Sequence, residues 1–211
     1  TLVTTKMVTR ELTRCMDGRT NNICVVAPNA ECITRARKIQ WELEEALPGR
    51  DVSFATYFDF DHFGAGPSDP RQIRSSDDSN KNIAYRDVII VDDLVDTAGT
   101  AAELARNLSR DGATNVFLVA SHGIFSGDAL ESLAKSPITK VFVTDSLPPP
   151  IAKNSLATTG LEKVSYVSLA SNLADLISQE FRRSNQLVFE SHDEMDDGAV
   201  EADFPDKSSS K

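Results

Sequence analysis

The sequence lacks the features that mark several common classes of protein. It has no run of about 18 apolar residues, the length that a membrane-spanning helix needs, and no signal-peptide pattern at its start. Its three cysteines, Cys15, Cys24 and Cys32, form no CxxC pair, and Cys24 lies in an apolar run where a buried, inert thiol is expected. An odd cysteine count without a framework favours a reducing compartment. We therefore expect a cytoplasmic protein that no membrane holds.

A basic surface for nucleic acid is also missing. The net charge is −10, but the segment 190–211 alone holds eight acids and two bases, which is −6. The other 189 residues then carry 24 acids and 20 bases, only −4, with no basic stripe to neutralise a phosphate backbone. Nucleic acid is not an expected partner. Because the chain begins at Thr1 and enters a helical pattern almost at once, we expect it to be a piece of a longer protein.

What the chain does contain is an alternation of strand and helix patterns. We expect helices over 3–15, 33–46, 100–110, 128–135 and 172–183, and strands over 23–27, 52–58, 88–91, 116–120, 140–144 and 164–167. Such alternation predicts an α/β fold, with a mostly parallel sheet flanked by helices. We assign residues 1–183 to this domain and 184–211 to an acidic tail that is expected to be disordered.

A long polar stretch, 59–86, interrupts the alternation and is expected to form a loop. Asp59, Asp61 and His62 at its start are metal-ligand types, but a solvated loop is the alternative that we favour.

The densest chemical signal follows the strand Val88–Val91. Carboxylates stand at its C-terminal end, where open α/β sheets bind ligands, and Gly99 then allows close approach of the backbone at the start of the next helix. Exposed amides at a helix N-terminus favour an anion, and carboxylates suit vicinal hydroxyls or Mg²⁺. The alternative is a simple helix cap at Thr97 beside solvated acids. No GxGxxG or GxxxxGK[ST] occurs, so the motifs of dinucleotide and Walker-type nucleotide sites are missing. From the carboxylates and the amides together we infer a sugar-phosphate site. Its residues are Asp92, Asp93, Asp96, Thr97, Ala98, Gly99 and Thr100.

The segment Val88–Thr100 resembles the phosphoribosyl-diphosphate loop of type I phosphoribosyltransferases and ribose-phosphate diphosphokinases. The downstream runs Ser121–Gly127 and Val143–Ser146 resemble the C-terminal half of the diphosphokinases. The resemblance covers about 1–183 and implies a type I phosphoribosyltransferase-like fold. It also implies that Asp92 binds the ribose hydroxyls of ribose 5-phosphate and that 96–100 cradle its phosphate. ATP would supply the diphosphate, with Mg²⁺ bridging its oxygens, in a homo-oligomer.

One histidine and three segments need separate treatment. His122 either packs locally or lines a nucleotide or subunit contact. The loop after the first strand is Asn29-Ala30-Glu31-Cys32, where the family typically has Asp-Ala-Gly-Gly, and Glu31 is a possible substitute acid. The stretch 52–62 has neither the Lys nor the Arg of the family's catalytic segment; Arg71 and Arg74 follow later. The run 182–189 matches the family's serine-rich regulatory ending poorly.

Three functions are compatible with these residues. The first is the second domain of a ribose-phosphate diphosphokinase, which transfers diphosphate from MgATP to ribose 5-phosphate. The second is a related non-catalytic subunit that keeps the sugar-phosphate loop and regulates active partners, and the departures at Asn29 and in 52–62 favour it. The third is a salvage phosphoribosyltransferase, against which the Asp92-Asp93 pair and the lack of an obvious base-binding hood argue.

Overall fold

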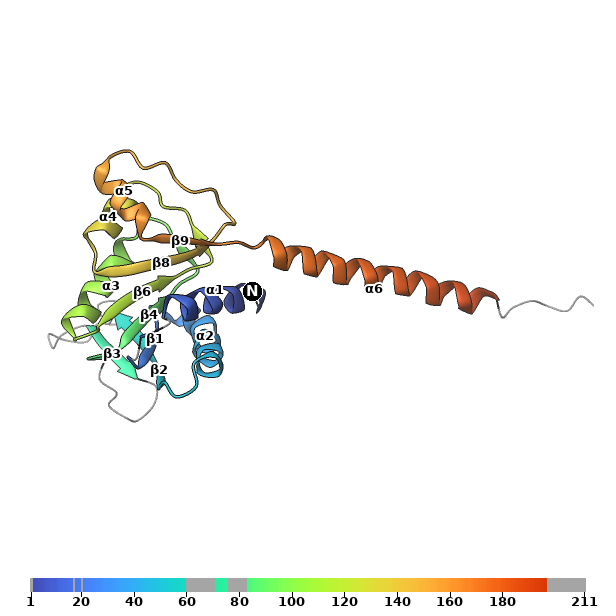
Figure 1. Cartoon of the computed structure of the whole chain (residues 1–211), viewed down its shortest axis with the longest axis horizontal. Coiled ribbons are helices and arrows are strands. Elements are labelled where there is room, and N and C mark those ends of the chain that lie inside the picture. Colours follow the sequence, from blue (N-terminus) through green and yellow to red (C-terminus); the bar gives the residue numbers. More distant parts are fainter. Residues whose placement is uncertain (1, 17, 20, 60–70, 76–82, 197–211) are drawn as a thin grey trace, which may run out of the picture. The chain divides into compact units, whose positions relative to one another are not determined.

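The computed structural model describes residues 2–16, 18, 19, 21–59, 71–75 and 83–196 (Figure 1). Its internal contacts divide the chain into two units, 1–169 and 170–211. The first half of the first unit contains α1 (Leu2–Cys15), β1 (Ile23–Ala27), the 3-10 turn η1 (Ala30–Cys32), α2 (Ile33–Ala46), β2 (Val52–Asp59), β3 (Arg71–Ser75), β4 (Asp87–Val91) and β5 (Leu94–Val95). The second half contains α3 (Gly99–Arg110), β6 (Asn115–Val119), β7 (His122–Gly123), α4 (Ala129–Lys135), β8 (Ile138–Thr144), α5 (Ser155–Glu162) and β9 (Val164–Val167).

The main sheet confirms the predicted fold class. Its strand order is β3-β2-β1-β4-β6-β8-β9, and every neighbouring pair is parallel except β2 with β3. From β1 the chain moves outward to β2, whereas from β4 it moves the other way, through β6 to β9. The carboxyl ends of β1 and β4 therefore flank the point where the order reverses, which is where open α/β sheets place their ligands.

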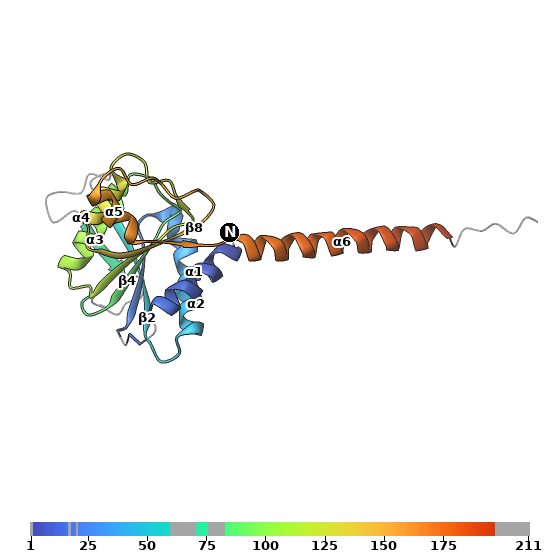
Figure 2. The ribbon, with the colours of Figure 1, turned by 45° about the horizontal axis from the view of Figure 1, so that its top comes forward.

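Helices cover both faces of this sheet, as Figures 1 and 2 show. Alternate residues of a strand point to opposite faces, so β4 contributes Val88 and Ile90 to one core and Ile89 and Val91 to the other. The first core includes residues of α3, α4 and α5, and the second includes residues of α1 and α2. All five residues of β1 and of β4 are buried, which explains the continuous apolar runs 23–27 and 88–91.

Among the strands and α-helices, three strands and one helix were not expected from the sequence. The predicted loop 59–86 contains β3, an antiparallel edge strand that pairs with β2 through backbone hydrogen bonds and has only Ile73 as an apolar residue. The eight-residue helix α5 was missed because its threonines and Gly160 are weak helix formers; the Asn154 side chain caps it by accepting from the Ala157 amide at 2.8 Å. Strands β5 and β7 are two residues each and form a separate parallel pair.

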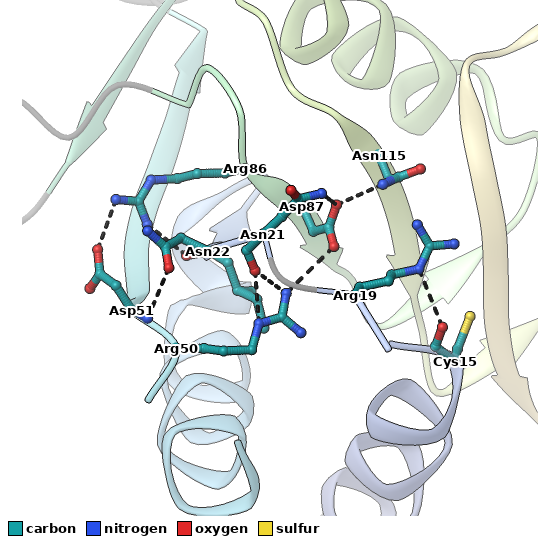
Figure 3. Close-up of polar contacts among 10 residues, drawn as sticks. Cys15, Arg19, Asn21, Asn22, Arg50, Asp51, Arg86, Asp87 and Asn115 are labelled. Atoms are coloured by element: carbon teal, nitrogen blue, oxygen red, sulfur yellow. Dashed lines mark hydrogen bonds and ion pairs between the residues drawn. The ribbon is translucent and has the colours of Figure 1, made fainter. Parts of the chain in front are cut away.

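The opposite end of the sheet, away from the carboxyl ends of the strands, is held by a buried polar cluster (Figure 3). Asp87, at the start of β4, is fully buried and accepts hydrogen bonds from the side-chain amides of Asn21 at 3.1 Å and Asn115 at 2.7 Å. Arg50 Nη2 lies 3.5 Å from Asp87 Oδ2, and Arg50 Nε donates to the Asn21 carbonyl at 2.8 Å. One carboxylate thus connects the segments that lead into β1, β2 and β6.

Gly160 is required where α5 crosses α4. A Cβ at this position would lie 1.8 Å from the Leu130 carbonyl oxygen and 2.6 Å from its carbonyl carbon, both backbone atoms that cannot rotate away. We expect Gly160→Ala to lower the free energy of unfolding by about 2–3 kcal/mol, measured by urea denaturation, because the helices must separate. Thr159→Ala, at the exposed neighbouring position, is the control; an equal effect of the two changes would contradict the steric explanation.

The second unit contains α6 (Ala170–Asp196), a 27-residue helix. The helix was expected over 172–183 with a disordered tail from 184, but it continues for a further 13 residues, to Asp196. No Gly or Pro interrupts the sequence before Gly198, so nothing local ends the helix earlier. The remainder of the predicted tail, 197–211, lies outside the described residues. Across the described part of the chain, no helix combines the length and apolar character needed to cross a membrane.

Candidate ribose-phosphate site

The predicted carboxylates lie at the carboxyl end of the central strand β4. The Asp92 amide continues the strand pairing by donating to the Val119 carbonyl of β6 at 2.8 Å. Asp92 is half-buried and Asp93 is exposed, so the pair offers one shielded and one solvated carboxylate. Burial raises the pKa of Asp92 above its ordinary value of 3.8. The adjacent acids therefore occupy different electrostatic environments at the edge where the parallel strands end.

The segment Asp96–Thr100 forms a tight turn into α3. Ala98 has φ 60° and ψ 4°, in the left-handed region, and its side chain is buried, whereas the other four residues are exposed. The turn ends at Gly99, the first residue of α3, whose amides at this end have no partner within the helix. Exposed backbone amides and the hydroxyls of Thr97 and Thr100 at a helix N-terminus can bind a phosphate group. The structure thus places together all seven residues that the sequence predicted.

A second segment, Ser121–Ser126, holds this loop from one side. The amides of Ser121 and His122 donate to the Asp93 carbonyl at 2.9 and 3.1 Å, and those of Ile124 and Phe125 donate to the Val95 carbonyl at 2.9 and 3.1 Å. Strands β5 and β7 pair within the same stretch. The loop after β4 is therefore fixed by the loop after β6.

Ser126 completes this support, and sequence reasoning did not select it. Its amide donates to the Asp96 carbonyl at 3.1 Å, and its hydroxyl donates to the Asp96 carboxylate. A hydroxyl donor stabilises the charged form of this carboxylate. The signal available in the sequence was the run from Ser121 to Gly127, although its residue pattern does not say which loop it supports.

His122 lies in the segment Ser121–Ser126 and is exposed. Its Nδ1 is 2.7 Å from the Ser146 hydroxyl, which lies 2.9 Å from the Thr144 hydroxyl; Thr144 in turn donates to the Ser121 carbonyl at 2.6 Å. The ring is thus oriented by the loop after β8, which satisfies one of its two nitrogens. A role for His122 in a nucleotide or subunit contact stays a prediction.

The loop after β1 meets Asp92 across the reversal point of the sheet. Asn29 caps η1, its side-chain oxygen accepting from the Cys32 amide at 3.0 Å. The Cys32 thiol, which is only 1% exposed, donates to Asp92 Oδ1 at 3.4 Å. Burial and the neighbouring Asp92 raise the pKa of this thiol to about 12, so it stays protonated. The exposed residues of the loop are Asn29, Ala30 and Glu31.

The remaining predicted groups are only partly described. Arg71 and Arg74 are in β3, and the backbone register pairs Arg71 with Asp59, at the same edge of the sheet as the site. Asp61 and His62 lie outside the described residues, so neither the solvated loop that we favour there nor a metal cluster is tested. Among the residues that are described, no three His, Cys, Asp or Glu side chains gather as a metal site.

Comparisons with known proteins agree with this arrangement. Residues 78–184 match the model of the phosphoribosyl synthetase-associated domain. The chain is 37% identical over 164 residues to a putative ribose-phosphate pyrophosphokinase 2 of Streptococcus pyogenes, covering 74% of this chain and 41% of that protein. It is 41% identical over 96 residues to the ribose-phosphate pyrophosphokinase of Vibrio cholerae, covering 46% of this chain and 29% of that protein. The chain thus spans less than half the length of these relatives.

A solved structure shows the same fold. The phosphoribosylpyrophosphate synthetase of Mycobacterium smegmatis superposes with a TM-score of 0.63 and 23% identity, covering 85% of this chain and 51% of that one. At that identity the superposition establishes the type I phosphoribosyltransferase-like fold alone, and the family rests on the sequence matches. On these grounds the chain belongs to the ribose-phosphate diphosphokinase (phosphoribosyl-diphosphate synthetase) family and corresponds to its C-terminal region.

Proposed function

We propose that this chain is the ribose 5-phosphate-binding part of a ribose-phosphate diphosphokinase. In that reaction the anomeric hydroxyl of ribose 5-phosphate attacks the β-phosphorus of MgATP, and the bond to the α-phosphate breaks, releasing AMP. The products are AMP and the 1-diphosphate of the sugar. The upstream part of the protein would supply most of the ATP site.

One observation carries the proposal: two carboxylates and an anion cradle occupy the same edge of the sheet. Asp92 and Asp93 directly follow β4, and the left-handed turn at Ala98 comes within six residues of Asp92. Vicinal sugar hydroxyls need acceptors, and a 5-phosphate needs donors. The spacing along the loop supplies both kinds of group to one small phosphorylated sugar. The brace Ser121–Ser126 supports the proposal, because a preorganised loop spends less free energy on ordering when it binds.

The donor set also fits a magnesium ion. Mg²⁺ usually takes only one or two carboxylates from a protein and completes its octahedron with waters and substrate phosphates. Asp92 and Asp93 would hold it, and when bound it would neutralise charge on the transferred diphosphate. The residues of this chain would then orient the sugar beneath the diphosphate.

A non-catalytic regulatory subunit is the second candidate, and a specific observation favours it. The loop after β1 carries Asn29 and the neutral Cys32 thiol where the family typically has a carboxylate and glycine. The described strand β2 also has no Lys or Arg. Against this, the backbone of Arg71 begins β3 at the same edge of the sheet as Asp92 and Asp93, so the sequence still has an arginine on that strand for an active enzyme. A homo-oligomer, or an assembly of related subunits, is the state that we expect for either candidate.

The test is AMP formation by the full-length protein with ATP, Mg²⁺ and ribose 5-phosphate. We expect AMP in proportion to added ribose 5-phosphate, and a loss of at least about 100-fold in the double variant Asp92→Asn, Asp93→Asn, because both sugar-hydroxyl acceptors lose their charge. The variant is the matched control, since it preserves size at both positions.

Binding separates the two candidates if no AMP forms. A rise in the thermal midpoint with millimolar ribose 5-phosphate, absent in the double variant, would then support the regulatory subunit. An unchanged midpoint in the wild-type protein would contradict both candidates.

A further inference from the structure

We propose that Cys32 is a positioning residue for Asp92, and that its thiol fixes the orientation in which this carboxylate meets the ribose hydroxyls. The inference rests on the proposed function, because it takes ribose 5-phosphate as the ligand. It assigns a role to a contact between two loops that are 60 residues apart in the chain.

The position of the thiol is set by the loop after β1. It lies in η1, where the Asn29 side chain accepts from the Cys32 amide at 3.0 Å and so fixes the backbone. The Sγ atom reaches Asp92 Oδ1 at 3.4 Å. Only 1% of Cys32 is exposed, which places it behind the carboxylate and out of the space that a ligand enters. Cys32 therefore supports Asp92 without obstructing it.

The same carboxylate oxygen has a second donor. Asp92 Oδ1 also accepts from the Asp93 amide at 2.9 Å. Two donors from different segments, one of them the buried thiol, restrict rotation of the carboxylate about its last bond. On this proposal the other oxygen, Oδ2, meets the sugar. As the donor in this contact the thiol keeps its proton, so it brings no charge to the site.

The contact also joins two parts of the site. The loop after β1 occupies the place of the family's Asp-Ala-Gly-Gly segment, and the loop after β4 carries the sugar acceptors. Glycine offers no side chain to join them, whereas Cys32 does. Replacing the thiol should therefore weaken the interactions with the ribose hydroxyls more than those with the 5-phosphate. On this proposal the 5-phosphate is bound by the backbone at Ala98 and Gly99.

The experiment measures binding to the full-length protein by calorimetry, with ribose 5-phosphate and 2-deoxyribose 5-phosphate as paired ligands. We expect Cys32→Ala to weaken ribose 5-phosphate binding about fivefold and to weaken the deoxy sugar clearly less, so that the ratio of the two affinities falls. Cys32→Ser keeps a donor and should restore the ratio. Cys15→Ala, a change on α1 away from the site, should leave both affinities unchanged.

Each other outcome is decisive. The positioning role would be overturned if Cys32→Ala left the ratio of the two affinities unchanged. It would also be overturned if the serine variant bound ribose 5-phosphate as weakly as the alanine variant. Neither result would affect the proposed function. Failure of the wild-type protein to bind ribose 5-phosphate would overturn the proposed function and this inference together. If Cys32→Ala lowers the ligand-free thermal midpoint, both affinities are measured at a temperature at which the variant is fully folded.

Discussion

Asp87→Ala should reduce the free energy of unfolding by about 3–5 kcal/mol, the largest stability loss that we expect in this chain, because the change breaks a buried ion pair from one side. Arg50, with only 12% of its side chain exposed, would lose its counter-charge, and the amides of Asn21 and Asn115 would lose their shared acceptor (Figure 3). Urea denaturation at neutral pH measures the change.

The matched control is Asp51→Ala. Asp51 pairs with Arg86 at 2.8 Å in the same region, but 41% of its side chain is exposed, so its removal should cost about 1 kcal/mol or less. Each variant removes one carboxylate charge, so the difference between the two losses in unfolding free energy measures the effect of burial. If Asp87→Ala were no more destabilising than Asp51→Ala, the cluster would not hold the strand ends together.

Ala98→Val should weaken ribose 5-phosphate binding at least about tenfold. Ala98 occupies the left-handed region at φ 60°, where a β-branched side chain is strongly disfavoured, and its small buried side chain leaves little room for two added methyl groups. The turn would change conformation, and the backbone amides at the start of α3 would no longer point at one phosphate. Calorimetric titration of the full-length protein with ribose 5-phosphate measures the loss.

Ala98→Gly separates backbone conformation from the side chain itself. Glycine adopts positive φ readily, so this variant should bind ribose 5-phosphate within about twofold of the wild-type protein. A glycine variant as weak as the valine variant would show that the methyl group contributes by contact. Equal binding by all three proteins would mean that the turn at Ala98 is not part of the phosphate site.

The regular elements near the site could be predicted because their signals are local. The buried strand β1 and the helix α2 have the expected bounds, since a continuous apolar run and a 3.6-residue period are properties of neighbouring residues. The edge strand β3 could not be predicted, because its pairing with β2 uses backbone groups that every sequence carries. The helix α6 extends beyond the expected 172–183, because no glycine or proline interrupts it before Gly198.

The sequence alone indicated the family, the fold class and the seven residues of the candidate site, because these depend on residue types at fixed short spacings. Only the tertiary structure decided what supports that loop: the thiol of Cys32 behind Asp92 and the hydroxyl of Ser126 on Asp96, contacts that span 60 and 30 residues. Such contacts follow from the strand order, which brings the carboxyl ends of β1, β4 and β6 to one edge. The left-handed turn at Ala98 also needed the fold, since alanine carries no local signal for positive φ and the surrounding packing imposes it.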